Sequence, residues 1–488
     1  MKHRHIRLYM LFFSLLLCCA IVAIAQEKKP RRFTLMGLGD SITEGADYFT
    51  CYLYPLWEKL FTAGYQFDFI GPRESKCRIG TLSHCGFSGK NVEFLESKID
   101  SIYRLYPADI VLLHAGHNHT VEENPVPGMI ASYKSIINKI LAINPHAHIL
   151  IAQVIPSGKL PKYSYIPELN EAIAKMVECL NLRQVSLVNQ AFGFDWQKYT
   201  VCDKVHPNEA GAEKMATVWF EALKKILASP EEAFSPEIVG YKKLEDGDSL
   251  ALHVFRPRET GDGEKRPAIV YFFGGGWKLG TPIQFYRECA YYASKGMVAV
   301  SVDYRIEYLH HSTPFESFED AKDAVRWLRN HASDYGINPD KIAVAGGSAG
   351  GHLAAALGTV GSEDTSSNCY RPNLSILYYP VVDMLSRSFG FSGTPESFKQ
   401  ISPFHNVSKA TPPTLILLGT KDSIVSVETI ETYRDKLLQN GVDCELYLFE
   451  GAGHPIFLYR KPLTEDYYKV RKLTDDFLRN FFFHILIP

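Results

Sequence analysis

The chain has 488 residues, of which 46% are hydrophobic and 22% are charged. These fractions are those of an ordinary water-soluble globular protein, and the length is more than one hydrophobic core usually serves, so we expect two or three domains. The formal net charge is −2, and no basic run or stripe is present, which argues against nucleic acid and polyanionic ligands.

The first 25 residues have the three parts of a secretion signal. Lys2, Arg4 and Arg7 make a charged start, an apolar run covers 8–22, and a small-x-small cleavage site ends at Ala25. Without these three basic residues the net charge changes from −2 to −5. The apolar run is short for a membrane span, so we expect an exported protein, periplasmic or extracellular, with no span after cleavage. An uncleaved anchor is the alternative.

Ten cysteines are present, and two of them, Cys18 and Cys19, lie in the apolar run. They suggest a lipoprotein, but Leu17 stands where a small residue would precede a lipidated cysteine. An oxidising compartment would allow some of the other eight to pair, although the sequence does not choose the pairs, and scattered buried thiols are the alternative. No Cys/His cluster has metal spacing, and we expect no metal or organic cofactor.

The first half of the chain alternates short apolar runs with amphipathic segments. Strands are expected at 33–38, 110–114, 148–154 and 185–188, and helices at 92–105, 130–143, 166–180 and about 209–227. Such alternation favours a parallel sheet with helices on both faces.

A Gly-Asp-Ser-Ile motif at 39–42 follows the first of these strands directly, which places the hydroxyl of Ser41 at the carboxyl edge of the sheet. A serine hydroxyl is a poor nucleophile until a base takes its proton, and Asp203 and His206 could supply the carboxylate and the base. The developing oxyanion would need donors, for which the candidates are the N–H groups of Ser41 and Gly89 and the amide of Asn118. Each motif alone is more often a turn or a surface loop.

In this order the motifs resemble the SGNH (GDSL-type) hydrolases, over about 32–227. The His-Cys-Gly-Phe-Ser-Gly stretch at 84–89 is similar to the second block of family-three carbohydrate esterases, which are acetyl xylan esterases. The resemblance implies a three-layer α/β/α domain. It also implies a nucleophile, two oxyanion donors and two partners that complete the triad: Ser41, Gly89, Asn118, Asp203 and His206.

The sequence departs from this pattern at His119, where the family commonly has Asp, which puts the local hydrogen bonding in question. Three more histidines, at 84, 114 and 117, lie near the expected site, but core or surface positions explain them as well. Glu44 and Asp47 are expected to be loop acids that could contact a sugar hydroxyl.

Pro- and Ser-containing segments at 229–236 predict a linker. A β-hairpin is then expected from 238–244 and 249–255, which an Asp-Gly pair connects. Further strands are expected at 268–273, 297–302, 342–345, 374–379, 414–418 and 444–449. The chain is thus predicted to hold two α/β domains, at 32–228 and 237–488, with no internal repeat.

A Gly-Gly-Ser-Ala-Gly motif at 346–350 lies between an apolar strand and an apolar helix, the context that a nucleophile elbow requires. A Gly-Gly-Gly-Trp segment at 274–277 ends another strand, as an oxyanion loop should. Asp422 and His454 each follow a later strand, so that Ser348, Asp422 and His454 occur in that order along the chain. Asp383 is an alternative acid. Trp277, Tyr304 and Trp327 could line a sugar or aryl pocket or belong to the core.

This half resembles the α/β-hydrolases that are similar to hormone-sensitive lipase and to feruloyl and acetyl xylan esterases, over about 236–483. The resemblance implies a second triad and three backbone oxyanion donors: Ser348, Asp422, His454, Gly275, Gly276 and Ala349. Phe273 replaces the histidine that the family has before the glycines. Because the donors are backbone amides, this change should affect how the loop is held rather than abolish the oxyanion hole.

Together the two halves predict a secreted bifunctional carbohydrate esterase that removes acetyl groups, and feruloyl as a further option, from a plant polysaccharide such as acetyl xylan. Its partner would be the acetylated poly- or oligosaccharide substrate; the oligomeric state stays open. One alternative is a single active esterase domain beside a silent sugar-binding module. Another is a lipase, thioesterase or peptidase.

Overall fold

The computed structural model describes residues 32–228, 234–245, 247–257, 265–361, 370–385, 389–457 and 464–482. The predicted secretion signal and most of the predicted linker lie outside these residues. The described residues divide into two compact units, of which the first holds most of 32–228 and the second holds those from 234 to 482. No helix in the described part is long and apolar enough to cross a membrane.

The first unit contains one seven-stranded sheet, in which the order is β3-β4-β1-β5-β6-β7 and β2 pairs with β1. Its strands are β1 (Phe33–Gly39), β2 (Phe67–Phe69), β3 (Arg73–Cys77), β4 (Gly80–Gly86), β5 (Ile110–His114), β6 (His148–Gln153) and β7 (Val185–Asn189). The pairs of β1 with β2, β4 and β5, and the pairs β5–β6 and β6–β7, are parallel. The four predicted strands are therefore confirmed. Strands β2 to β4 escaped prediction because they are short or polar, and β3 is an exposed edge strand.

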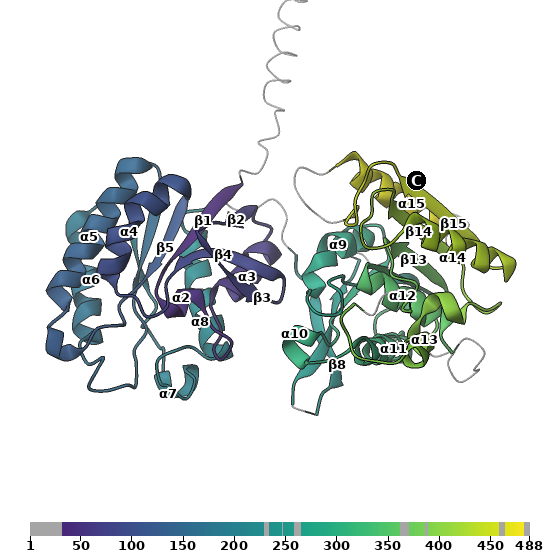
Figure 1. Cartoon of the computed structure of the whole chain (residues 1–488), viewed down its shortest axis with the longest axis horizontal. Coiled ribbons are helices and arrows are strands. Elements are labelled where there is room, and N and C mark those ends of the chain that lie inside the picture. The colour runs from purple at the N-terminus through teal and green to yellow at the C-terminus, as the bar shows by residue number, and fades with distance from the viewer. Residues whose placement is uncertain are drawn as a thin grey trace, which may run out of the picture. The chain divides into compact units, whose positions relative to one another are not determined.

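The helices of this unit cover both faces of the sheet (Figure 1). They are α2 (Ser41–Glu44), α3 (Leu53–Thr62), α4 (Val92–Leu105), α5 (Val126–Ile143), α6 (Ile166–Leu180), α7 (Trp196–Tyr199) and α8 (Glu209–Lys224), with a 3-10 turn η1 (Val121–Glu123). The apolar faces of α4, α5 and α6 form one core with β1, β5 and β6. Helix α5 begins four residues earlier than predicted, because prolines at its first turn suit a helix start.

The second unit contains an eight-stranded sheet of order β15-β14-β13-β12-β10-β11-β9-β8. Its strands are β8 (Glu237–Lys243), β9 (Ser249–Phe255), β10 (Arg266–Phe272), β11 (Val298–Val302), β12 (Ile337–Gly347), β13 (Leu374–Tyr378), β14 (Thr414–Gly419) and β15 (Cys444–Phe449). The hairpin β8–β9 is antiparallel, β9 is antiparallel to β11, and the remaining pairs are parallel. The predicted hairpin and strands are confirmed, and so is the α/β class of both halves.

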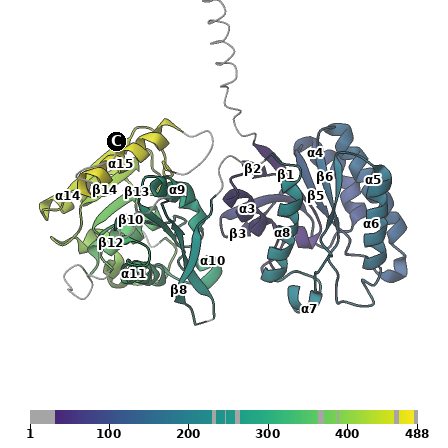
Figure 2. The same cartoon turned by 180° about the vertical axis from the view of Figure 1, so that it is seen from behind.

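Helices pack on this sheet as well (Figures 1 and 2). They are α9 (Tyr286–Ser294), α10 (Glu307–His310), α11 (Pro314–Asn330), α12 (Ala349–Thr359), α13 (Pro395–Ile401), α14 (Val427–Gln439) and α15 (Glu465–Phe482), with 3-10 turns η2 (Pro282–Phe285) and η4 (Pro403–Asn406). Tyr291 of α9 donates a 2.7 Å hydrogen bond to Asp475 of α15, which ties these two helices together.

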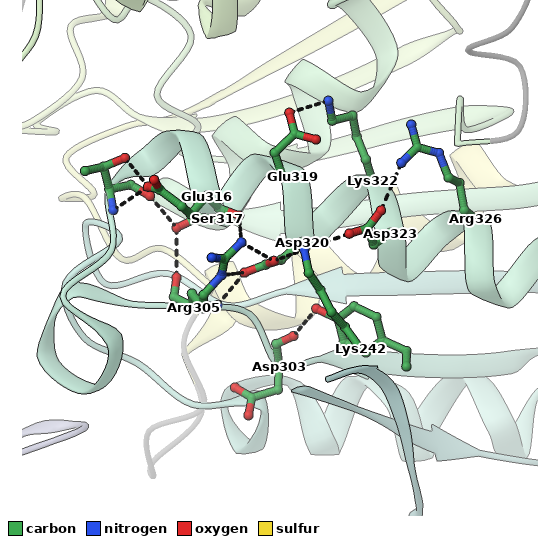
Figure 3. A network of polar contacts seen from close by, with 12 residues as sticks. Lys242, Asp303, Arg305, Glu316, Ser317, Glu319, Asp320, Lys322, Asp323 and Arg326 are labelled. Carbon is green, nitrogen blue, oxygen red and sulfur yellow. Dashed lines mark hydrogen bonds and ion pairs between the residues drawn. The ribbon is translucent and has the colours of Figure 1, made fainter. Parts of the chain in front are cut away.

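A buried carboxylate anchors the first strand of this unit to α11 (Figure 3). The side chain of Asp320 is fully buried and accepts hydrogen bonds from Lys242 Nζ of β8 at 2.6 Å and from Arg305 Nε at 2.8 Å. It also accepts from the backbone N–H of Arg305 at 3.0 Å. Two cations and one backbone group thus compensate for the burial of this charge, and they fix the segment that follows β11.

Two candidate active sites

Ser41 lies at the junction between β1 and α2. Asp40 caps this short helix by accepting from the N–H of Ile42, and Ser41 is its first residue. The Oγ of Ser41 lies 2.8 Å from Nε2 of His206. Nδ1 of His206 lies 2.5 Å from Oδ2 of Asp203. The structure therefore brings together the hydroxyl, imidazole and carboxylate that the sequence analysis singled out.

The imidazole of His206 is held on two sides. Oδ1 of Asp203 accepts from the backbone N–H groups of Val205 and His206, at 2.9 and 3.0 Å, which fixes the carboxylate. Burial raises the pKa of Asp203, but the hydrogen bonds from His206 and Val205 outweigh it, so the pKa lies below its ordinary value. Phe49 stacks on the imidazole, with ring centroids 4.1 Å apart and planes 20° apart.

The candidate oxyanion donors lie in separate loops. No hydrogen bond within the described part of the chain uses the N–H of Ser41 or Gly89, so both remain available. Asn118 donates one amide hydrogen to Lys90 O at 3.0 Å and has a second to offer.

Glu44 lies on α2, and it is not the loop acid that the sequence analysis expected. Its Oε2 accepts from the backbone N–H of Ser88 at 2.5 Å, and its other oxygen pairs with Arg73. Glu44 thus ties the Gly89 loop to the helix that carries Ser41.

His119, which stands where the family commonly has Asp, is held by two carboxylates. Its Nδ1 lies 2.6 Å from Glu123 Oε2, and its Nε2 lies 2.8 Å from Glu93 Oε2. Because ionised carboxylates only accept, both ring nitrogens must carry a proton, and the imidazole is cationic. Burial lowers the pKa of His119, but the bonds to Glu123 and Glu93 outweigh it and hold the pKa above its ordinary value. The residue next to Asn118 is therefore clamped between α4 and η1.

This clamp predicts a pH-dependent stability of the first unit. The folded pKa of His119 lies above the unfolded value of about 6.5, so its contribution is complete below that pH and is lost as the pH rises through the folded pKa. We expect His119→Gln to lower the urea midpoint of the first unit more at about pH 6 than at about pH 9. His146→Gln, at an exposed histidine with no described side-chain contact, is the control and should cause equal, small shifts at both pH values. Equal shifts for His119→Gln would contradict the prediction.

The three remaining histidines near this site are interior. His84 accepts from Gly86 N–H at 3.0 Å through Nδ1, and its Nε2 lies 2.8 Å from Ser75 Oγ. His114 and His117 are buried, and burial is the main cause that lowers the pKa of His114 to about 4 and that of His117 to about 3. Burial likewise lowers the pKa of His84 to about 4, so all three are neutral near pH 7. This supports the core interpretation of these positions.

Ser348 occupies a strained turn between β12 and α12, with φ 56° and ψ −117°. The glycines of the motif make the turn possible: a Cβ on Gly350 would lie 2.0 Å from Phe272 O, and one on Gly346 would lie 2.3 Å from Gly350 O. The backbone N–H of Ser348 donates to Tyr378 O at 3.0 Å. These features are those of a nucleophile elbow.

The imidazole of His454 connects Ser348 with a carboxylate. Its Nε2 lies 2.9 Å from Ser348 Oγ, and its Nδ1 lies 2.7 Å from Asp422 Oδ2. Oδ1 of Asp422 accepts from the N–H groups of Ile424 and Val425, at 2.8 and 2.9 Å. Burial raises the pKa of Asp422, but the bonds from His454 and these two N–H groups outweigh it, so the pKa lies below its ordinary value.

Asp383, the alternative acid, faces a different histidine. Its Oδ1 is 3.8 Å from Nδ1 of His405 and accepts from the N–H of Leu385 at 2.9 Å. The carboxylate that contacts His454 is that of Asp422.

The expected oxyanion loop keeps its amides available. Gly275 and Gly276 have φ of 141° and 64°, and a Cβ on Gly275 would lie 2.1 Å from Leu279 O. No hydrogen bond within the described ranges uses the N–H of Gly275, Gly276 or Ala349. Gln284 supports the loop by accepting from the N–H of Gly274 at 2.6 Å.

Phe273 shows how the loop is held without the family's histidine. Its ring stacks on Tyr304, with centroids 4.0 Å apart, and the Tyr304 hydroxyl donates to Phe273 O at 2.6 Å. The N–H of Glu307 donates to Trp277 O at 2.9 Å. Trp277 and Tyr304 are fully buried, so they belong to the core rather than to a sugar pocket.

Sequence reasoning missed Phe49 and Gln284, and it missed the supporting role of Glu44. Phe49, Glu44 and Gln284 hold an imidazole or an oxyanion loop, but none stands in a motif. For Phe49, a signal was present in the aromatic pair that follows the first serine motif within eight residues. For Gln284 the sequence offers no signal, because its contact depends on how η2 folds back onto the loop.

Both halves match known families. Residues 38–214 match the GDSL-like Lipase/Acylhydrolase family, and residues 252–389 match the family BD-FAE. Neither match covers half of the chain.

Individual proteins are similar to parts of the chain. Esterase LipC of Mycobacterium tuberculosis is 30% identical over 234 residues, which cover 43% of this chain and 57% of LipC. An acetylxylan esterase of Xylanibacter ruminicola is 29% identical over 218 residues, which cover 41% of this chain and 44% of that protein. The apo form of Thermogutta terrifontis esterase 2 is 37% identical, with a TM-score of 0.48, over 54% of this chain and 100% of that one.

The chain spans about half the length of these two curated relatives. The family matches, in contrast, fall on the two sheets and include Ser41, Asp203 and His206 in one and Ser348 in the other. The chain therefore combines an N-terminal GDSL-like domain with a C-terminal α/β-hydrolase-like domain, the part that is similar to the BD-FAE family.

Proposed function

We propose that the chain is a secreted esterase with two independent serine sites, which removes acetyl groups from acetylated plant polysaccharide, with acetyl xylan as the substrate. The observation that carries the proposal is geometric. Each serine hydroxyl lies 2.8 or 2.9 Å from an imidazole whose other nitrogen faces a carboxylate. Two complete sets of this kind in one chain support two active sites rather than one site and a silent module.

In the first site, His206 takes the proton of Ser41 as Oγ attacks the acyl carbonyl. The negative charge that develops on the carbonyl oxygen is received by the N–H groups of Ser41 and Gly89 and by the free amide hydrogen of Asn118. Asp203 stabilises the resulting imidazolium, which then protonates the leaving alcohol. A water molecule, activated by the same imidazole, releases the acid from the acyl-enzyme.

The second site runs the same two-step transfer with Ser348, His454 and Asp422. Its oxyanion donors are three backbone amides, those of Gly275, Gly276 and Ala349. Serine chemistry of this type requires neither a metal ion nor an organic cofactor.

Three observations support the polysaccharide substrate and export. The segment at 84–89 is similar to a block of family-three carbohydrate esterases, and one relative of the chain bears the name acetylxylan esterase. The first 25 residues have the pattern of a secretion signal. Two sites on one chain also raise the local concentration of the second site near a polymer that the first has engaged.

The test is acetate release from an acetylated xylo-oligosaccharide, followed by NMR, for the wild type, Ser41→Ala, Ser348→Ala and the double variant. We expect each single variant to leave a different subset of the acetyl positions uncleaved. If the substrate also carries feruloyl groups, each variant should lose the cleavage of one of the two acyl types. The double variant should lose about a million-fold in kcat. Ser97→Ala, at an exposed serine on α4, is the control and should resemble the wild type.

Three outcomes would contradict the proposal. If one single variant loses all activity on every ester and the other loses none, the second domain is a silent module. Strong preference of the wild type for long acyl chains would indicate a lipase instead. Retention of the signal segment in protein recovered from the cell interior would contradict export.

A further inference from the structure

Tyr48 is an exposed aromatic side chain in contact with the imidazole of the first site. Its ring centroid lies 6.0 Å from that of His206, with the planes at 84°, yet 65% of the residue is exposed. The neighbouring Phe49 stacks on the same imidazole and is only 7% exposed. Of two adjacent aromatic residues, one is therefore a buried support and the other remains open to solvent.

The backbone presents Tyr48 in a defined position. Ala46 and Phe49 form an isolated antiparallel bridge, and the N–H of Phe49 donates to Ala46 O at 3.2 Å. Tyr48 stands in the turn between them and packs edge-on against Phe49, at 4.9 Å and 76°. No hydrogen bond in the described residues uses its hydroxyl. Packing thus accounts for the place of the ring but not for its exposure.

The chemistry of the site indicates which part of a substrate lies near Tyr48. The imidazole of His206 has Asp203 at Nδ1 and Phe49 on one ring face. Its Nε2 must hand a proton to the leaving alcohol, so that alcohol has to lie beside the imidazole. For a sugar ester, the leaving alcohol is a pyranose, and the exposed ring of Tyr48 borders the same imidazole.

We propose that Tyr48 forms a sugar subsite on the leaving-group side of the first site, where its ring stacks against the pyranose whose ester is cleaved. The negative face of an aromatic ring attracts the polarised C–H groups on a pyranose face. Tyr48 then determines specificity for a ring-shaped alcohol, whereas Phe49 positions the base. The proposal rests on the function proposed for the first site.

The test uses the full chain with Ser348→Ala as the parent, so that only the first site acts. The readout is kcat/KM for an acetylated xylo-oligosaccharide and for ethyl acetate, whose leaving alcohol has no ring. We expect Tyr48→Ala and Tyr48→Leu to lower kcat/KM for the sugar ester about 3- to 10-fold, mainly through KM, and to leave ethyl acetate unchanged. Tyr48→Phe and Tyr48→Trp should retain the activity on the sugar ester.

Phe192→Ala is the matched control. Phe192 is 79% exposed and follows β7 at the same carboxyl edge of the sheet, but no described ring contact joins it to His206. Phe192→Ala should leave kcat/KM for both substrates unchanged. A loss on the sugar ester as large as that of Tyr48→Ala would overturn the assignment to Tyr48.

The remaining outcomes separate this proposal from the function on which it rests. If Tyr48→Ala lowers kcat/KM equally for both substrates, the ring only supports the imidazole. If kcat/KM for the sugar ester is unchanged, the ring binds no sugar. Either result overturns the subsite and leaves the esterase function standing. If the parent cleaves ethyl acetate but no sugar ester, both proposals fail. If adding Ser41→Ala to the parent leaves all activity intact, the proposed function of the first site fails by itself.

Discussion

Asp422→Asn is expected to lower kcat of the second site about ten-thousand-fold. The carboxylate accepts the Nδ1 hydrogen of His454 at 2.7 Å, which leaves Nε2 unprotonated and able to take the proton of Ser348. The other oxygen of Asp422 accepts from two backbone N–H groups, so an asparagine would keep its carbonyl oxygen there. Its amide nitrogen would then face Nδ1 and donate to it. The imidazole would hold its hydrogen on Nε2, where it cannot act as a base.

The measurement uses Ser41→Ala as the parent, so that only the second site contributes to ester hydrolysis. Asp383→Asn is the matched control, because this carboxylate also follows a strand of the same sheet but lies near His405. We expect less than a threefold change for it, because the histidine that it faces is not the base of the second site. A large loss in Asp383→Asn together with a small loss in Asp422→Asn would reverse the assignment of the acid.

Asp320→Asn is expected to destabilise the second unit by about 3 to 5 kcal/mol. The side chain of Asp320 is fully buried, and it is the shared partner of Lys242 and Arg305, each of which is 22% exposed. The variant leaves Arg305 facing a neutral amide that cannot satisfy its charge, whereas Lys242 keeps its contact with Asp323 at 2.7 Å. Because Arg305 follows Tyr304, on which Phe273 stacks, we also expect a lower kcat at the second site in the folded variant.

This prediction is checked by urea titration. The loss of Ser348-dependent hydrolysis reports the unfolding of the second unit. Glu319→Gln is the control. Glu319 is the neighbour of Asp320 on α11, but among the described residues its one ion pair is with Lys322 at the surface, where 54% of its side chain is exposed. Surface pairs contribute below about 1 kcal/mol, so its midpoint should hardly move. Equal midpoints for both variants would show that the Asp320 cluster does not stabilise the unit.

Much of the fold was predictable because the buried parallel strands are short apolar runs. The predicted strands at 110–114 and 444–449 and the predicted helices at 92–105 and 166–180 have the observed bounds. The edge strand β3 was not predictable in the same way. Its residues are mostly polar and exposed, so no apolar periodicity marks it, and its pairing depends on β4.

The sequence by itself determined the two α/β domains and the order of the chemical groups, because parallel strands deliver their carboxyl ends to one edge of a sheet. Ser41 and His206, separated by 165 residues, could be matched by motif alone. Only the tertiary structure decided that Asp422 rather than Asp383 faces His454, that His119 is held between two carboxylates, and that Phe49 supports an imidazole beside an open Tyr48. These contacts depend on loop conformation and on distances between segments remote in sequence, which no local pattern of residues encodes.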